Sequence, residues 1–339
     1  MAEPTSQSQS PSPPRPPLLD VHVHAVGAGD SDSGIWVSPR YRRSPVWLFA
    51  KWQLGLLGSD GRIDRTYAEK LAAAVRESPL DAAVVQGFDG FYDARGELDR
   101  RRTDFLVPNE HVARLGADFP EILPAASVNP LRRDWADELA KCAEFRCLYV
   151  KINPCAMGFD PGEERLRTFY RRMAELRLPL MCHIGPERAL TSFGHRLADP
   201  AGLGPALEEG LVVIAAHAGT SAAVVDRHPY FANLVRMMER HERLYADSSA
   251  IAQPPRWHWM RRIAGNELVR SRLLHGSDYP LPPVALPWGG MNWRKCRALP
   301  RGNNIARDFA IKEAFGIGRE AAERAGAVLM PAARPTPTD

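Results

Sequence analysis

The sequence predicts an α/β protein built as a (β/α)8 TIM barrel, and three observations support this fold class. Short apolar runs alternate with amphipathic stretches through the interior of the 339-residue chain. Most of these runs are continuous, which is typical of parallel strands covered on both faces. From the third run onward they end at positions 128, 153, 183, 217, 248 and 278, and intervals of 25 to 34 residues suit one strand and one helix each. An open doubly wound sheet is the alternative, but no GxGxxG follows the first run.

Each of the eight predicted strands ends in a polar or glycine-rich turn. In chain order they are Leu19–His24, Ala82–Gln86, Ile122–Val128, Cys147–Asn153, Leu178–His183, Leu211–His217, Arg243–Ser248 and Arg272–Asp278. Between them, apolar residues at helical spacing predict helices over Arg62–Glu77, Glu163–Leu176 and Phe231–Glu242.

Two connections are too long to be simple turns. Ala25–Gly61 follows the first strand and Pro280–Pro300 follows the eighth, and both are rich in tryptophan and arginine. Loops that follow barrel strands lie over the C-terminal face, where barrel active sites are found, so we expect both loops to cover a site. Whether their tryptophans line that site or only pack the loops down is left open.

Prolines concentrate at the two ends of the chain, where nine of the 30 are found. The first 17 and the last nine residues are polar as well as proline-rich, which is typical of solvated chain ends. The sequence therefore predicts disordered ends over 1–17 and 331–339 and one barrel domain over 18–330.

The composition excludes several classes of function. A net charge of +4 is too small to indicate a nucleic-acid-binding protein. No run approaches about 18 apolar residues, so we expect neither a membrane span nor a membrane partner. The N-terminus lacks the apolar segment of a secretory signal, and the five cysteines are odd in number and form no CxxC pair. These features predict a reduced, cytoplasmic protein that acts on a small-molecule substrate.

Four histidines and one aspartate fall at the C-terminal ends of predicted strands, namely His22, His24, His183, His217 and Asp278. All strand C-termini of a parallel barrel lie at one rim, so these side chains are expected to converge. Because side chains on a strand alternate with a period of two, His22 and His24 point to the same side. Imidazole and carboxylate ligands suit Zn²⁺ or a similar divalent ion, so the set predicts a metal site.

The motifs around these residues resemble those of the amidohydrolase superfamily. They are Asp20–His24 (DVHVH), Ser127–Pro130 (SVNP), Cys182–Gly185 (CHIG), Ala216–Gly219 (AHAG), Tyr245–Ser249 (YADSS) and His275–Pro280 (HGSDYP). Their order is most similar to the amidohydrolase-related branch that includes aminocarboxymuconate-semialdehyde decarboxylase, other aromatic-acid decarboxylases, and hydrolases of lactones and ring-cleavage products. The resemblance runs from Leu18 to Ile317 and is specific for the fold and the metal rim, not for the substrate.

The resemblance implies a division of roles among the rim residues. His22, His24, His183 and Asp278 would bind one divalent metal ion, for which we expect Zn²⁺. A bound metal lowers the pKa of water to about 7, which would give hydroxide at neutral pH. His217 would polarise the substrate or the metal-bound water, and Asp278 would also accept a proton from that water.

Lys151 leaves the number of metal ions open. Binuclear members of the superfamily carry a carboxylated lysine on the fourth strand that bridges two metals, and His183 and His217 would then both bind the second ion. This branch often has a lysine there with one metal only, so we favour an unmodified Lys151. Lys151 and Asn153, which share a strand face, are candidate substrate-binding residues. Arg188 is a third candidate because guanidinium pairs with carboxylates, although an exposed loop arginine is the alternative.

Two activities are expected from these inferences. The first is a metal-dependent hydrolase, in which metal-bound hydroxide attacks a C–O or C–N bond of a small carboxylated or cyclic substrate of the lactone or amide type. The second is a metal-dependent non-oxidative decarboxylase of the same branch. Some decarboxylases of the branch replace the first histidine of the HxH pair with glutamate, so retention of both histidines favours the hydrolase. Decarboxylases of the aminocarboxymuconate-semialdehyde type also keep both histidines, so the pair alone does not decide between the two activities.

A barrel that binds metal but has lost catalysis is a third reading. The complete set of five rim residues argues against it. Related enzymes are often dimers, which leaves a homodimer open for this chain.

Overall fold

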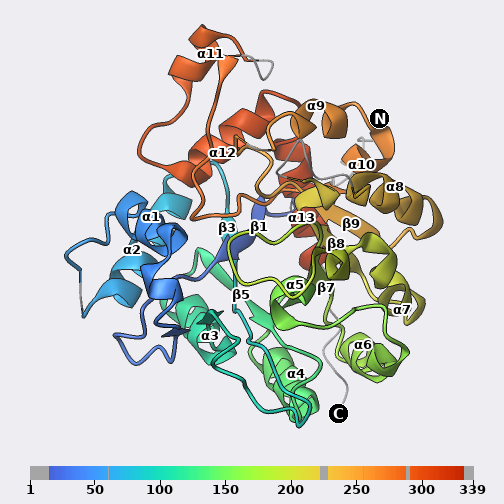
Figure 1. The fold of residues 1–339 in the computed structure, drawn as a ribbon. Coiled ribbons are helices and arrows are strands. Elements are labelled where there is room, and N and C mark those ends of the chain that lie inside the picture. The colour runs from blue at the N-terminus through green and yellow to red at the C-terminus, as the bar shows by residue number, and fades with distance from the viewer. Residues whose placement is uncertain (1–14, 60, 222–227, 255, 288–290, 332–339) are drawn as a thin grey trace, which may run out of the picture.

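Eight parallel strands form the centre of the computed structural model, which describes residues 15–59, 61–221, 228–254, 256–287 and 291–331. In spatial order they are β1 (Leu19–His24), β3 (Ala82–Gln86), β5 (Ile122–Ser127), β6 (Val150–Ile152), β7 (Leu180–His183), β8 (Val213–Ala216), β9 (Leu244–Asp247) and β10 (Leu273–Leu274). The segment after β10 returns to β1, where the amide of Asp278 donates to the His22 carbonyl at 2.9 Å. The strands therefore close into the predicted (β/α)8 barrel, which confirms the fold class (Figure 1).

The observed strands agree with the predicted ones in order and position. β1 and β3 have the predicted bounds, and the other six are shorter at one end or both. β10 differs most, because the backbone leaves the ladder after Leu274. The amide of His275 donates to the carbonyl of Ala321 at 3.2 Å, and Asp278 has a left-handed φ of 65°. The last predicted strand therefore ends in an irregular segment that carries Asp278 to the rim.

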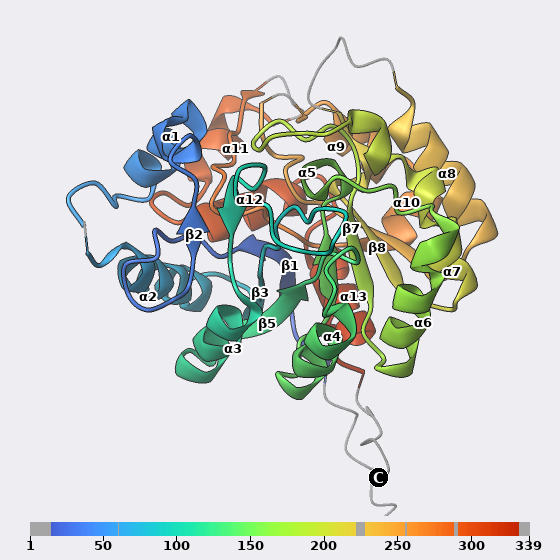
Figure 2. The same ribbon diagram turned by 60° about the horizontal axis from the view of Figure 1, so that its bottom comes forward.

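Helices surround the strands (Figure 2). They are α1 (Pro45–Gln53), α2 (Ile63–Arg76), α3 (Asn109–Asp118), α4 (Trp135–Glu144), α5 (Pro154–Met157), α6 (Arg167–Glu175), α7 (Gly204–Glu208), α8 (Tyr230–Arg240), α9 (Trp259–Ala264), α10 (Glu267–Ser271), α11 (Trp293–Ala298), α12 (Asn304–Glu313) and α13 (Arg319–Leu329). α2 and α8 match two of the predicted helices to within two residues at each end. The third begins as a 3-10 turn at Glu164–Leu166 and continues as α6.

Alternate residues of a strand enter two different cores. Val150 and Ile152 of β6 join an outer apolar cluster that includes Tyr170 of α6. Tyr149 and Met181 belong instead to an inner cluster, which Leu329 of α13 also joins. Two residues further along these strands, Lys151 and His183 are buried and polar. The barrel interior therefore changes from apolar to polar toward the C-terminal ends of the strands.

The long loop after β1 is folded. It contains α1 and β2 (Trp36–Val37), which pairs antiparallel with β4 (Phe105–Leu106) from the loop after β3. α1 begins after Ser44, whose side chain accepts the amide of Trp47, and Pro45 takes the first helical position. The loop after β10 contains α11. Both long loops leave the C-terminal ends of their strands, as predicted.

The chain ends are only partly described. Residues 1–14 and 332–339 lie outside the described residues, and so does most of the prediction of disordered ends. Arg15 is described and pairs with Asp81 at 3.4 Å. Among the helices of the described chain, none combines the length and the apolar character needed to cross a bilayer.

Candidate metal centre

His22, His24 and Asp278 meet at the C-terminal end of β1. The Nε2 atoms of His22 and His24 lie 3.4 and 3.2 Å from Oδ1 of Asp278. One ligand atom from each residue lies within 4.8 Å of the other two, a spacing at which the three could hold one metal ion. His22 and Asp278 are buried, whereas His24 keeps partial access to solvent. The two strand histidines thus converge, and Asp278 joins them from the segment after β10.

Left-handed backbone conformations hold two of the rim residues. His217 opens the 3-10 turn η5 (His217–Gly219) directly after β8 with φ 60°, and Asp278 has φ 65°. Such values are costly for residues other than glycine and cluster at functional sites. At His217 the conformation is stabilised by its amide, which donates to Oδ1 of Asp247 at 2.9 Å, and by its carbonyl, which accepts the hydroxyl of Thr220 at 2.7 Å. The backbone therefore supports a functional role for both side chains.

Asp247, at the end of β9, orients His22. Its Oδ2 lies 2.7 Å from Nδ1 of His22, and its Oδ1 accepts the amides of His217 and Ser249, both at 2.9 Å. Burial by itself would raise the pKa of Asp247, but the interactions with His22, His217 and Lys151 outweigh burial and hold that pKa well below its ordinary value. An ionised carboxylate only accepts hydrogen bonds, so His22 donates from Nδ1. Its Nε2 then presents a lone pair toward Asp278.

A second chain of hydrogen bonds runs from Asp247 through Ser249 and His217 to His183. The Ser249 hydroxyl donates to Oδ1 of Asp247, and its oxygen lies 2.8 Å from Nδ1 of His217. Nε2 of His217 lies 3.1 Å from Nδ1 of His183. Because the one hydroxyl proton of Ser249 points at Asp247, the Ser249 oxygen accepts from His217, and Nε2 of His217 accepts from His183. Nε2 of His183 is left with a lone pair.

The position of His183 differs from that of the other predicted ligands. It lies outside both compact groups of ligand atoms found among the described residues, which are His22–His24–Asp278 and His22–His217–Asp247. Its Nε2 is buried without a hydrogen-bond partner in the described chain, and Oε2 of Glu187 lies 3.9 Å away. In this structure, His183 is therefore linked to the other rim residues through its hydrogen bond to His217.

Burial favours the neutral form of three rim imidazoles, those of His22, His183 and His217. It lowers the pKa of His183 to about 4 and lowers the pKa of both His22 and His217, the latter strongly. Asp278 behaves in the opposite way, because His24 and His22 outweigh its burial and hold its pKa well below the ordinary value. Neutral imidazole and ionised carboxylate are the forms that bind metals.

The donor set and its surroundings fit a divalent ion. Three imidazoles and one carboxylate suit Zn²⁺ and similar ions. The lone pair on Nε2 of His183 is an orphaned buried acceptor that such an ion would satisfy. Close packing behind His22 depends on Gly276, where an added Cβ would lie 2.7 Å from the Cβ of His22.

The three predicted substrate-binding residues occupy different environments. Lys151 is buried with Nζ 3.3 Å from Nε2 of His22, and burial lowers its pKa to about 8. Asn153 is engaged at both ends of its amide, because Nδ2 donates to Glu187 at 2.7 Å and Oδ1 accepts the amide of Ala156 at 3.2 Å. Arg188 is exposed on the loop after β7. Lys151 is thus the one that contacts a rim histidine directly.

Several residues near the site were missed by the sequence analysis. Gln86, at the end of β3, places Nε2 3.2 Å from both ring nitrogens of His24. Arg256 is buried, and its Nη1 has no hydrogen-bond partner among the described residues. Burial lowers the pKa of Arg256, while the charges of Asp278, Glu187 and Asp247 act in the opposite direction. Gln86 and Asp247 end predicted strands or lie one residue before the end, so the convergence of strand C-termini could have identified them. Arg256 lies on a loop, where the sequence shows no periodic pattern of apolar residues.

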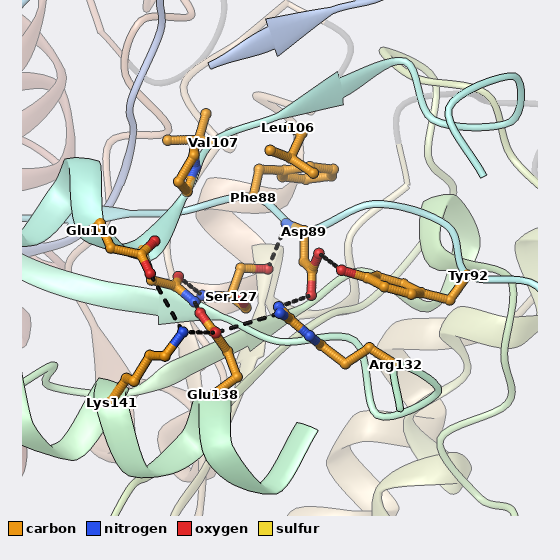
Figure 3. A pocket seen from close by; sticks show the side chains of 12 residues that line it. Phe88, Asp89, Tyr92, Leu106, Val107, Glu110, Ser127, Arg132, Glu138 and Lys141 are labelled. Atoms are coloured by element: carbon orange, nitrogen blue, oxygen red, sulfur yellow. Dashed lines mark hydrogen bonds and ion pairs between the residues drawn. The ribbon is translucent and has the colours of Figure 1, made fainter. Parts of the chain in front are cut away.

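A second polar cavity, of about 200 Å³, lies between the loop after β3 and helices α3 and α4 (Figure 3). Arg132 lies between Asp89 and Glu138, 3.3 Å from each carboxylate, and Lys141 contacts Glu138 at 3.3 Å. None of the rim histidines lines this cavity. Since its buried charges are paired with one another, it offers no reactive group comparable to the metal centre.

A (β/α)8 barrel with a buried His/His/Asp group at the C-terminal ends of its strands defines a class of metal-binding barrel enzymes. The family model described as Amidohydrolase matches residues 19–299, a range that includes all eight strands. The chain belongs to the amidohydrolase family. Among curated protein sequences, none matches this chain.

Solved structures share the fold at low sequence identity. An uncharacterized TIM-barrel protein from Bordetella bronchiseptica is 16% identical with a TM-score of 0.57, and the match covers 92% of this chain and 99% of that one. 2,6-Dihydroxybenzoate decarboxylase from Rhizobium is 14% identical with a TM-score of 0.51, covering 92% and 99%. 5-Carboxyvanillate decarboxylase from Sphingomonas paucimobilis is 14% identical with a TM-score of 0.50, covering 89% and 99%. At these identities the likeness concerns the fold alone.

Proposed function

We propose that this amidohydrolase-family enzyme is a metal-dependent hydrolase of a small carboxylated or cyclic substrate of the lactone or amide type. The observation that carries the proposal is the His22–His24–Asp278 group, whose ligand atoms lie within 4.8 Å of one another at the barrel rim. We also propose one Zn²⁺ per chain, with Lys151 unmodified. A divalent ion held by His22, His24, His183 and Asp278 supplies Lewis acidity toward a water molecule or a substrate carbonyl oxygen.

Two rim residues would handle protons. Asp278 is ionised, so its carboxylate can accept a proton at the metal group. His217 donates from Nδ1 to Ser249, and the lone pair of its Nε2 accepts from Nδ1 of His183. Nε2 could take up a proton once this hydrogen bond from His183 opens. Once protonated there, His217 would donate a hydrogen bond to a developing oxyanion. Asp247 holds the imidazole of His22 directly, and it holds His217 through the backbone amide and, by way of Ser249, through the imidazole.

The surroundings of Arg256 support a substrate that carries a carboxylate. A buried guanidinium with a free nitrogen is costly unless it gains an acceptor, and a substrate carboxylate is a suitable one. Arg188, exposed on the loop after β7, lies near enough to Arg256 to lower its pKa further. Together they would attract an anionic group to the mouth of the site.

Decarboxylation is the second candidate, and the strong burial of the site favours it. Lys151, His183 and His217 are all buried, which limits the access of water to the site that they line. A carboxylate that enters such a pocket loses its hydration, and this removes part of the barrier to losing CO₂.

The test uses the full-length protein loaded with Zn²⁺ and a panel of lactones and carboxylated ring-cleavage products in ¹⁸O-labelled water. Hydrolysis predicts label in the product acid, with loss of turnover in a His217→Gln variant. Release of CO₂ without incorporated label would replace the hydrolase by the decarboxylase. Full metal loading with no turnover on either reaction would contradict both activities.

A further inference from the structure

The two long loops at the rim of the barrel carry more basic than acidic residues, and their acidic residues, Asp30, Asp32 and Asp60, lie near the two ends of the first loop. The part of the first loop over residues 33–59 contains four basic residues, and the second loop over residues 279–303 contains four more. The whole chain has a net charge of +4, so the residues outside these segments have a net charge of −4. β1 and the segment after β10 are bridged through Val23 and Tyr279, so the two loops start from neighbouring positions on the barrel. Positive charge is therefore concentrated on one part of the molecule.

The same two segments expose large apolar side chains. Seven such residues are exposed in the described chain, and five of them lie here, namely Leu48 (52%), Phe49 (46%), Trp52 (64%), Leu57 (59%) and Trp293 (68%). Phe49 and Trp52 form a ring pair on α1 with centroids 5.8 Å apart. Exposed apolar groups gathered in this way mark an interaction surface more often than scattered ones do.

The basic residues beside these groups keep their charge. Arg42, which precedes α1, donates to the carbonyl of Ala28, and Lys70 of α2 donates to the carbonyl of Leu54, which follows α1. Neither contact cancels the charge of the side chain. On α11, Arg294, Lys295 and Arg297 are exposed, and no ion pair is recorded for them among the described residues. Arg40 differs because it pairs with the buried Asp104. Figure 2 shows α1 and α11 on the same side of the barrel, away from α13.

We propose that α1 and α11 form a peripheral docking surface for an anionic lipid bilayer. Tryptophan, phenylalanine and leucine next to lysine and arginine is the composition of segments that lie in a membrane interface. Anionic headgroups supply the negative charge that this surface lacks, and the cytoplasmic leaflet is the one that carries them. The expectation of no membrane partner was based on the absence of a spanning run, which a peripheral surface does not need.

A second copy of the chain is the less suitable occupant. A two-fold contact through α1 would bring two surfaces with an excess of basic residues together, and like charges across an interface repel. Docking on lipid would instead turn the rim loops, and with them the metal centre, toward the bilayer. The inference concerns the surface of the rim loops and is independent of the reaction proposed above.

The experiment measures co-sedimentation of the full-length protein with phosphatidylcholine vesicles and with vesicles that also contain phosphatidylserine. Binding to the anionic vesicles is expected to be at least about tenfold stronger and to fall with added salt. A Phe49→Ser/Trp52→Gln variant and an Arg294→Gln/Lys295→Gln/Arg297→Gln variant are each expected to bind about tenfold or more weakly. The control is Arg165→Gln/Arg171→Gln/Arg172→Gln, which removes three charges outside the two segments and should bind like the unmodified protein.

Three results would overturn the proposal. The first is equal binding to neutral and anionic vesicles, or no binding to either. The second is a control variant that loses as much binding as the α11 variant. The third is a dimer by light scattering that the Phe49→Ser/Trp52→Gln variant converts to a monomer while vesicle binding is absent, which would assign the surface to a second copy. Circular dichroism of each variant shows whether the fold is retained.

Discussion

Ser249→Ala tests the hydrogen-bond chain that prepares His183 for a metal. Ser249 is buried, donates to Asp247 and lies 2.8 Å from Nδ1 of His217. Without the hydroxyl, Nδ1–H of His217 has no acceptor at this position. The ring can then move its proton to Nε2, which makes it a donor toward Nδ1 of His183. His183 must accept there and carry its own proton on Nε2, the atom whose lone pair would bind the metal.

The size of the effect follows from the contacts that are lost. Leaving Nδ1–H unpaired in a buried site costs about 1–3 kcal/mol, and moving the proton removes one ligand lone pair instead. Loss of an outer hydrogen-bond partner typically weakens metal affinity tenfold to a hundredfold, or about 1.4–2.7 kcal/mol. We therefore expect Zn²⁺ to bind Ser249→Ala about tenfold to a hundredfold more weakly.

The assay is competition for Zn²⁺ against a chromophoric chelator, with Ser248→Ala as the matched control. Ser248 is the adjacent serine and equally buried, but its hydroxyl contacts the backbone of Gly276 and no imidazole. Ser248→Ala should keep the unmodified affinity. The reasoning is refuted by an unchanged affinity in Ser249→Ala, or by an equal loss in both variants.

Three further predictions concern catalysis, packing and pH. His217→Gln should lower kcat by about 10²–10⁴ while metal stays bound, because the glutamine carbonyl can still accept from His183 but cannot shuttle a proton; loss of the metal would instead favour a ligand role for His217. His275 is buried against Phe309 with no hydrogen-bond partner for either ring nitrogen in the described chain, so His275→Leu should raise the free energy of unfolding in urea by about 1–3 kcal/mol, and a loss of stability would contradict this. The free energy of unfolding of the metal-free protein should fall as the pH drops from about 6.5 toward about 4, because the buried histidines His22, His111, His183, His217 and His275 bind protons more readily when unfolded. Burial raises the pKa of Asp20 to about 6 and of Asp308 to about 7, which acts in the opposite direction, but these are two groups against five. A free energy of unfolding that rises as the pH drops would contradict the lowered pKa values.

Much of the fold could be predicted because the spacing of apolar residues along the sequence differs between strands and helices. The bounds of β1 and β3 agree with the continuous apolar runs, and the HxH pair converges because side chains on a strand alternate. Asp278 could be placed at the rim, although the strand expected to carry it is mostly irregular. Its left-handed φ depends on contacts with β1 that lie far away in the sequence.

The rest of the site depends on side-chain contacts between elements that are far apart in the sequence, and the spacing of residues along the chain does not encode these contacts. Asp247 was seen only as part of a motif, and its bonds to His22, His217 and Ser249 appear once β1, β8 and β9 are adjacent. Arg256 comes from a loop with no periodic signal. Likewise, a net charge of +4 does not reveal that the segments 33–59 and 279–303 of the rim loops are basic while the rest of the chain has a net negative charge.

The central claim is that the rim holds one divalent ion, and the metal content of the protein tests it most directly. The full-length protein is stripped of metal, supplied with Zn²⁺ or Mn²⁺, freed of excess ion and analysed by mass spectrometry beside a His24→Ala/Asp278→Ala variant. The account predicts one ion per chain in the unmodified protein and almost none in the folded variant. Equal metal in both proteins, or two ions per chain with a carboxylated Lys151, would contradict it.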